Sequence, residues 1–263
     1  MAAGLTLDQP QRAFFAEHGW LVVRGVVAAA RVAELAQVLD KLFMPAFYPS
    51  QGSHVWEVPG LSKGFEAVLR HARDPAMAAL AAQALGARRL RLLQDTCLVK
   101  PPLTGGRVEW HQDYTYVGYL DPPRAITARL ALAPCTPERG GMMVLDGSHR
   151  WGLLGGVQAL SAPRVTDALR LLGDDEAARA AAGATAIGLE PGDVSLHHCL
   201  TFHGSGENRS AEARKTLITR YFDGECRLVP ERLPSKEALA HFPADAEGRL
   251  SEEAFPVVYE APH

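Results

Sequence analysis

The chain has 263 residues, of which 47% are hydrophobic and 22% charged, a composition typical of a soluble globular protein with a sizeable core. A formal net charge of −3 provides no basic surface for nucleic acid. No apolar stretch reaches the roughly 18 residues of a membrane span, and residues 1–11 lack the pattern of a secretory signal, so we expect neither. The four cysteines form no Cys-x-x-Cys pair, and we expect reduced thiols and a cytoplasmic location.

The first 86 residues favour helices. Segments beginning at Asp8 and at Asp74 each start with a capping aspartate and stop before a glycine, which are ordinary helix boundaries. Apolar residues recur at helical spacing over 29–43 and predict an amphipathic helix. Residues 20–23 predict a short strand. The polar and aromatic stretch 45–64 is predicted as a loop and is a candidate lid.

Beyond Arg88 the hydrophobic period changes to that of short strands. Residues 163–182, rich in alanine, leucine and arginine, predict a helical insertion. Many short strands separated by turns indicate a sandwich or barrel, so we expect a mainly β, cupin-like jelly roll with helices outside it, in one domain over residues 1–263. The expected strands are 90–99, 125–132, 142–145, 185–189, 194–198 and 216–222.

The tetrapeptide Trp-His-Gln-Asp at 110–113 carries the most specific chemical signal. On an extended strand His111 and Asp113 would point to the same face, because they are two residues apart. A histidine from a distant strand, with His203 as the candidate, would complete two imidazoles and one carboxylate. That set binds one face of a ferrous ion and leaves three positions open. The same donors also suit a zinc-dependent hydrolase, which stays an alternative on the residues alone.

Five motifs follow one another in a characteristic order. They are Lys-Pro-Pro at 100–102, Trp-His-Gln-Asp at 110–113, the segment 140–149 ending in Gly-Ser-His, Pro-Gly-Asp-Val at 191–194, and His-Gly-Ser-Gly-Glu-Asn at 203–208 with Arg214 beyond it. The ordered set resembles the phytanoyl-CoA dioxygenase family of non-haem iron(II)- and 2-oxoglutarate-dependent oxygenases. The resemblance is strong over residues 98–222 and weak in the N-terminal helix-strand unit. It implies a double-stranded β-helix.

The resemblance also implies roles for individual residues. His111, Asp113 and His203 would be the catalytic metal ligands. Arg214 would pair with the far carboxylate of 2-oxoglutarate, with the Ser205 hydroxyl assisting it. A guanidinium suits this role because its planar fork matches a carboxylate, as an ammonium does not.

Arg129 departs from the pattern, because many members of the family carry tryptophan at this place. An arginine in an apolar strand is costly unless it is paired. Facing inward, it would bind 2-oxoglutarate or an anionic substrate, with Ala128 and Leu130 on the opposite, packed face. Facing outward, it would be an ordinary surface residue.

The implied activity is an iron(II)- and 2-oxoglutarate-dependent dioxygenase that uses O₂, releases succinate and CO₂, and hydroxylates an unactivated C–H bond of a small molecule. Ascorbate should help it in vitro. Desaturation or epoxidation with the same cofactors, and a non-catalytic jelly-roll binding protein, are the alternatives. The candidate substrate contacts are Gln94, Trp56, Tyr114 and Tyr116, and His198 is expected to pack beneath the ligands or support them.

Overall fold

The computed structural model describes residues 5–44, 52, 54–155, 171–173, 180 and 183–262. Short helices precede and flank antiparallel strands. The helices and strands are α1 (Gln9–His18), β1 (Trp20–Val23), α2 (Ala29–Leu42), β2 (Trp56–Pro59), α3 (Glu66–Ala72), α4 (Pro75–Leu85), β3 (Arg89–Lys100), β4 (Val108–His111), α5 (Tyr114–Val117), β5 (Leu120–Asp121), β6 (Ala125–Ala131), β7 (Met142–Val144), β8 (Thr185–Ala186), β9 (Val194–His198), β10 (His203–Ser205), β11 (Arg214–Asp223), β12 (Arg227–Leu228) and β13 (Val257–Glu260).

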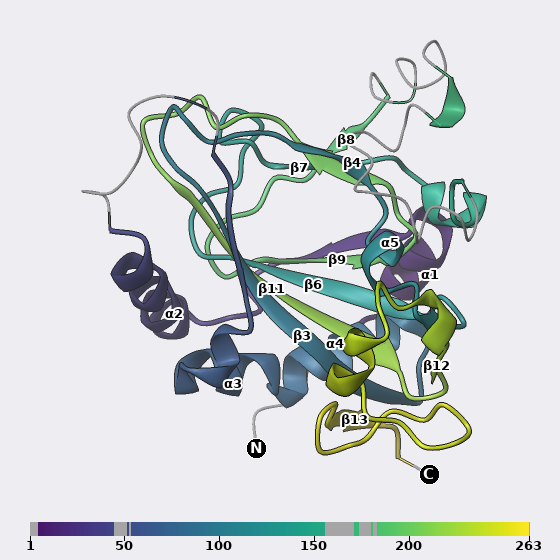
Figure 1. Ribbon diagram of the computed structural model, residues 1–263. Helices are drawn as coiled ribbons and strands as arrows, with labels where there is room; N and C mark the ends of the chain where they lie inside the picture. The colour runs from purple at the N-terminus through teal and green to yellow at the C-terminus, as the bar shows by residue number, and fades with distance from the viewer. Residues whose placement is uncertain are drawn as a thin grey trace.

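Two antiparallel sheets form the body of the structure. The larger sheet has the order β1-β9-β6-β11-β3-β13, with β2 paired to β3, and the smaller has the order β4-β10-β7-β8. In Figure 1 the larger sheet crosses the middle of the molecule, the smaller sheet lies above it, α3 and α4 lie below it, and α2 lies at the left. The expected mainly β architecture with helices outside the sheets is therefore observed.

Side chains point alternately to the two faces of each central strand. One face meets the hydrophobic core, and the other meets the space between the sheets. In β6, Ile126, Ala128 and Leu130 belong to the core cluster that also contains buried residues of α2 and α4. Thr127 and Arg129 point the other way and line a cavity. One face of each strand is thus used for packing, and the other is available for polar groups.

The main difference from the sequence prediction lies in residues 45–64, which were expected to be a loop. The strand β2 forms inside this stretch, because the edge of β3 offers unpaired main-chain groups, and Trp56 pairs with Val99 in register. A short 3₁₀ helix, Leu61–Lys63, follows it. Residues 45–51 and 53, and most of the expected helical insertion at 163–182, lie outside the described residues.

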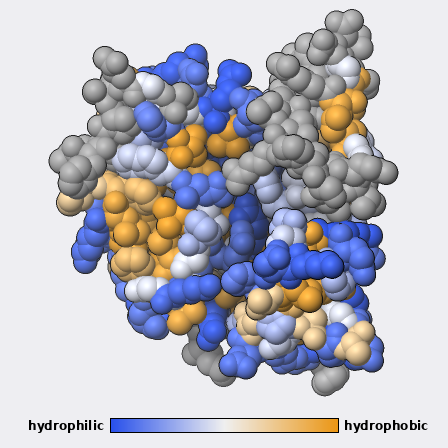
Figure 2. All heavy atoms as spheres, viewed as in Figure 1, coloured by the Kyte–Doolittle hydropathy of each residue, from blue (hydrophilic) through white to orange (hydrophobic). Residues whose placement is uncertain are grey.

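The face seen in Figure 2 has hydrophilic residues in a central hollow, while hydrophobic residues gather over α2. Leu42 and Met44, at and just beyond the end of that helix, are both exposed. No helix among the described residues is long and apolar enough to cross a membrane.

The helix α4 provides a test of the local capping prediction. The Asp74 carboxylate accepts hydrogen bonds from the main-chain nitrogens of Ala76 at 2.9 Å and Met77 at 3.3 Å. We expect Asp74→Ala to lower the free energy of unfolding by about 1 kcal/mol, since these donors lose their acceptor. Urea denaturation measures the change. Asp74→Asn should retain most of the stability, and equal losses in the two variants would contradict the capping role.

Candidate active site

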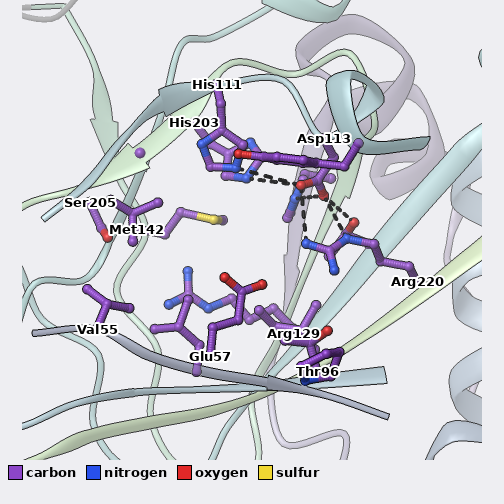
Figure 3. A pocket seen from close by; sticks show the side chains of 18 of the residues that line it. Val55, Glu57, Thr96, His111, Asp113, Arg129, Met142, His203, Ser205 and Arg220 are labelled. Atoms are coloured by element: carbon purple, nitrogen blue, oxygen red, sulfur yellow. Dashed lines mark hydrogen bonds and ion pairs between the residues drawn. The ribbon is translucent and has the colours of Figure 1, made fainter. Parts of the chain in front are cut away.

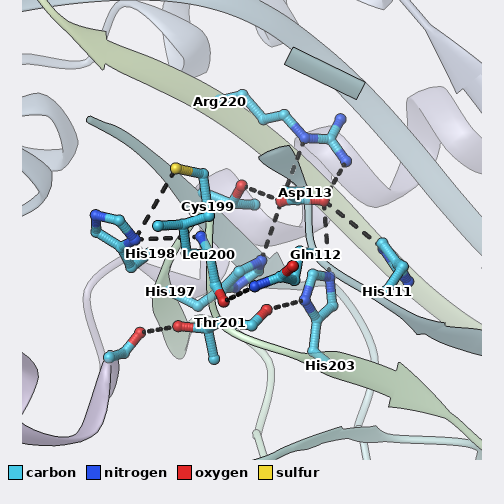
Figure 4. Close-up of polar contacts among 12 residues, drawn as sticks. His111, Gln112, Asp113, His197, His198, Cys199, Leu200, Thr201, His203 and Arg220 are labelled. Carbon is cyan, nitrogen blue, oxygen red and sulfur yellow. Dashed lines mark hydrogen bonds and ion pairs between the residues drawn. The ribbon is translucent and has the colours of Figure 1, made fainter. Parts of the chain in front are cut away.

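The three expected metal ligands come together in space although they are distant in sequence. His111 ends β4 and pairs directly with His203 at the start of β10, while Asp113 follows two residues after His111. The Nε2 atoms of both histidines lie 3.7 Å from Asp113 Oδ1. One donor atom from each residue lies within 4.8 Å of the others. Figure 4 shows the three side chains turned toward one another.

Main-chain carbonyls orient both imidazole rings. His111 Nδ1 lies 2.7 Å from the carbonyl oxygen of Glu109, and His203 Nδ1 lies 3.0 Å from that of Thr201. A carbonyl only accepts, so each Nδ1 donates its proton to that carbonyl and each Nε2 is turned toward the centre. Burial and then the neighbouring His111 hold the pKa of His203 well below its usual value. The neutral ring is the form that binds a metal.

The Asp113 carboxylate is held by the larger sheet. Its Oδ2 accepts hydrogen bonds from Thr127 Oγ1 at 2.5 Å, His197 Nε2 at 3.2 Å and Arg220 Nε at 3.5 Å. Burial alone would raise the pKa of Asp113, but the positive charge of Arg220, together with the neighbouring histidines, holds that pKa well below its usual value. Asp113 is therefore ionised. These three donors hold Oδ2, while Oδ1 faces the histidines and accepts from Arg220 Nη2 at 3.4 Å.

This donor set fits a ferrous ion. Two imidazole nitrogens and one carboxylate oxygen converge from one side, and three protein ligands leave positions open on an octahedral ion. Within the described part of the chain, these three residues are the group of histidine and acidic side chains close enough together to hold a metal ion.

A cavity of about 510 Å³ lies beside the three residues, between the sheets. Arg214 lines it, is fully buried, and has no hydrogen-bond partner for any of its three guanidinium nitrogens. Arg129 also lines it, is 5% exposed, and has no partner for Nε and Nη2. Figure 3 shows Arg129 across the cavity from the histidines. Unpaired buried cations are costly, so both arginines indicate an anionic ligand.

Lys100 adds a third buried basic group beside this end of the cavity. It lies opposite Arg214 in the β3–β11 pairing, and its Nζ donates to Ser205 Oγ at 2.7 Å and to the carbonyl oxygen of Gly206. Burial, followed by repulsion from Arg129, lowers the pKa of Lys100 to about 7. Ser205, which was expected to assist Arg214, lines the cavity with that arginine, and its hydroxyl accepts a hydrogen bond from Lys100.

Asn208, the last residue of the His-Gly-Ser-Gly-Glu-Asn motif, has a structural role. Its Nδ2 donates to the carbonyl oxygens of Lys100, Pro101 and Glu212 at 3.1, 3.0 and 2.8 Å. The side chain is fully buried. It ties the loop after His203 to the turn after β3, and this places Arg214 at the start of β11.

The candidate substrate contacts divide into two groups. Gln94 and Tyr116 line the cavity. Trp56 and Tyr114 are not part of its lining, contrary to expectation. Trp56 lies on the other face of β2 and stacks on Phe43, with ring centroids 5.0 Å apart, and the buried Tyr114 hydroxyl donates to a main-chain carbonyl. Aromatic character alone did not distinguish packing from a binding role.

The sequence prediction missed Thr127, Arg220 and His197, and it expected His198 to pack beneath the ligands or support them. His197 is the one that bonds Asp113, whereas His198 accepts from the main-chain nitrogen of Leu200. Strand alternation contained the missing signal. Thr127 and Arg220 each lie an even number of residues from an arginine that faces the cavity.

The ligand assignment predicts the effect of removing one imidazole. His111→Ala and His203→Ala should each lose binding of Mn(II), used as a spin-active substitute for iron(II), because two protein ligands remain. Electron paramagnetic resonance titration measures the free ion, and circular dichroism checks the fold. His241→Ala, at an exposed histidine, is the matched control. Undiminished binding in either variant would remove that histidine from the site.

The role of Asp113 in metal binding is better tested by substitution to asparagine than to alanine. Asp113→Ala would leave Arg220 without its carboxylate partner, a change expected to lower stability by about 3–5 kcal/mol. Asp113→Asn keeps the shape and one acceptor oxygen, and should weaken metal binding with a smaller loss of stability.

Comparison with known proteins agrees with this geometry. The family model for phytanoyl-CoA dioxygenase matches residues 15–216. A probable alpha-ketoglutarate-dependent hypophosphite dioxygenase of Stutzerimonas stutzeri is 31% identical over 132 residues, which cover 50% of this chain and 45% of that protein. Ectoine dioxygenase of Sphingopyxis alaskensis is 29% identical over 230 residues, covering 80% and 74%.

A solved structure extends the agreement to the fold. The epimerase SnoN, in complex with Fe³⁺, alpha ketoglutarate and nogalamycin RO, has a TM-score of 0.69 at 26% identity, covering 95% of this chain and 98% of that one. The predictions of family, jelly-roll fold and reaction class are confirmed. This chain belongs to the phytanoyl-CoA dioxygenase family of iron- and 2-oxoglutarate-dependent oxygenases.

Proposed function

We propose that the protein hydroxylates an unactivated C–H bond of a small molecule, with iron(II), 2-oxoglutarate and O₂, and releases succinate and CO₂. The observation that carries the proposal is one cavity that joins a two-histidine, one-carboxylate donor set to a buried arginine without a partner. A zinc-dependent hydrolase would not need that arginine. A non-catalytic binding protein would not need the donor set.

The side chains prepare the site for the metal. His111, Asp113 and His203 would hold iron(II), which supplies the activation of O₂ that couples decarboxylation of 2-oxoglutarate to substrate oxidation. The carbonyl contacts of both histidines keep Nε2 directed at the ion, and Arg220 keeps Asp113 charged. The two sheets flank the reacting groups, which would limit the access of water to them.

The two unpaired arginines suit a dianionic cosubstrate. Arg214 would hold the far carboxylate of 2-oxoglutarate, with Lys100 beside it, and Arg129 would hold the carboxylate nearer the metal. An anionic substrate is the second possible partner for Arg129. The buried charges favour either partner over an uncharged one, because a guanidinium buried without an acceptor is destabilising.

The size of the cavity supports a small-molecule substrate. Its roughly 510 Å³ lies in the range of ordinary ligand pockets. The related proteins act on chemically different compounds, and SnoN is an epimerase, so the same cofactors serve more than one outcome. Desaturation and epoxidation therefore stay as alternatives to hydroxylation.

The reaction class has a direct test. Purified protein with iron(II), ascorbate and 2-oxoglutarate should form succinate and CO₂ slowly without its substrate, and faster with it. A panel of small molecules, read by mass spectrometry for the gain of one oxygen atom, identifies the substrate. Absence of both 2-oxoglutarate binding and succinate would contradict the proposal.

Arg214→Ala tests the cosubstrate site. The far carboxylate loses a charge-assisted contact worth about 2–5 kcal/mol, so the KM for 2-oxoglutarate should rise by a factor of ten or more while Mn(II) binding stays unchanged. Arg209→Ala, an exposed arginine in the preceding loop, is the control and should behave as the wild type. An unchanged KM in Arg214→Ala would mean that another cation holds this carboxylate.

Arg129→Gln separates the two partners proposed for Arg129. If Arg129 serves the cosubstrate, the dissociation constant of 2-oxoglutarate from the Mn(II)-loaded protein rises at least tenfold, measured by calorimetry. An unchanged constant would assign the arginine to an anionic substrate instead.

A further inference from the structure

The strand β2 carries one carboxylate into the cavity. Val55, Glu57 and Pro59 alternate along it and line the cavity. Trp56 lies on the opposite face, where it packs against the hydrophobic core and stacks on Phe43. Pairing with β3, in which Glu57 lies opposite Leu98, fixes this register. A shift by one residue would bury the Glu57 carboxylate in the core and is therefore disfavoured.

Glu57 reaches toward the candidate metal ligands from the opposite wall. Figure 3 shows its carboxylate projecting from β2 into the cavity, below His203 and Asp113. The acidic side chains of the lining are Glu57 and Asp113. The charge of Glu57 acts on Arg220, but that guanidinium makes its contacts with Asp113, at 3.4 and 3.5 Å. Glu57 thus keeps a carboxylate that the described cavity residues do not pair.

The cosubstrate is an unsuitable neighbour for Glu57, because both are anions. The cations that suit 2-oxoglutarate, Arg214 and Arg129, belong to β11 and β6 of the larger sheet. Glu57 comes from the edge strand β2, where its side chain is exposed. A molecule placed between β2 and the metal would meet Glu57 first. The group that it presents there must donate hydrogen bonds or carry positive charge.

We propose that Glu57 determines substrate choice by binding a nitrogen cation, such as a protonated amine, on the substrate. This inference rests on the proposed function and names the substrate class of the same site. It is compatible with an acidic group elsewhere on the substrate, since Arg129 lies on a different strand. A carboxylate at the mouth of the cavity also attracts cations and repels anions as they enter.

The test uses three molecules of similar shape and different charge: 2-phenylethylamine, 2-phenylethanol and 3-phenylpropanoate. Each is titrated into the full-length protein loaded with iron(II) and 2-oxoglutarate in the absence of O₂, and calorimetry gives the dissociation constant. The wild type should bind the amine at least tenfold more tightly than the alcohol or the acid. Glu57→Gln should lose that preference and keep its affinity for the alcohol, and Glu57→Asp should keep part of the preference.

Two controls make the result specific. Glu66→Gln, at an acid in the first turn of α3 outside the cavity lining, should retain the amine preference. Glu66→Gln should also equal the wild type in its affinity for 2-oxoglutarate and in the slow formation of succinate. No amine preference in the wild type, or a preference that persists in Glu57→Gln, would overturn the inference while leaving the proposed function intact. A wild type that neither binds 2-oxoglutarate nor forms succinate would overturn both.

Discussion

The Asp113 carboxylate is the contact on which the rest of the site depends. Thr127 and His197 donate to one oxygen, Arg220 contacts both oxygens, and the second oxygen also faces the two histidines of the smaller sheet. A single buried charge therefore fixes how the two sheets meet at the metal position. Its charge depends on Arg220, because burial without a positive partner would favour the protonated carboxyl group, which binds a metal poorly.

The two faces of the larger sheet have different roles, because side chains alternate between them along each strand. The helices α2 and α4 cover one face of the larger sheet with apolar side chains, so the other face can carry charged residues without weakening the core. The cavity then has two chemically different sides. Arg129 and Arg214 provide positive charge along β6 and β11, whereas Glu57 provides negative charge from the edge strand β2. This separation lets one cavity hold an anionic cosubstrate and a substrate of a different charge.

Local rules predicted the features that depend on neighbouring residues. The aspartate caps and glycine stops of α1 and α4 were readable, as were the central strands and the His-x-Asp pair. Local rules did not predict the features that depend on residues distant in the sequence. The Lys100–Ser205 contact joins residues 105 positions apart, and β2 forms only because β3 presents an edge to it. For the same reason the sequence did not indicate that Trp56 turns away from the cavity, since its stacking on Phe43 depends on how β2 lies against α2.

The most direct test of the central claim is calorimetric titration of 2-oxoglutarate into the protein, without O₂, with and without iron(II). If the donor set and Arg214 form one cosubstrate site, the iron-loaded protein binds one molecule of 2-oxoglutarate per chain, and removing the metal weakens that binding strongly, because the cosubstrate loses its attachment to the ion. Equal affinity in the two states would mean that 2-oxoglutarate does not bind at the His111–Asp113–His203 centre, and would contradict the account.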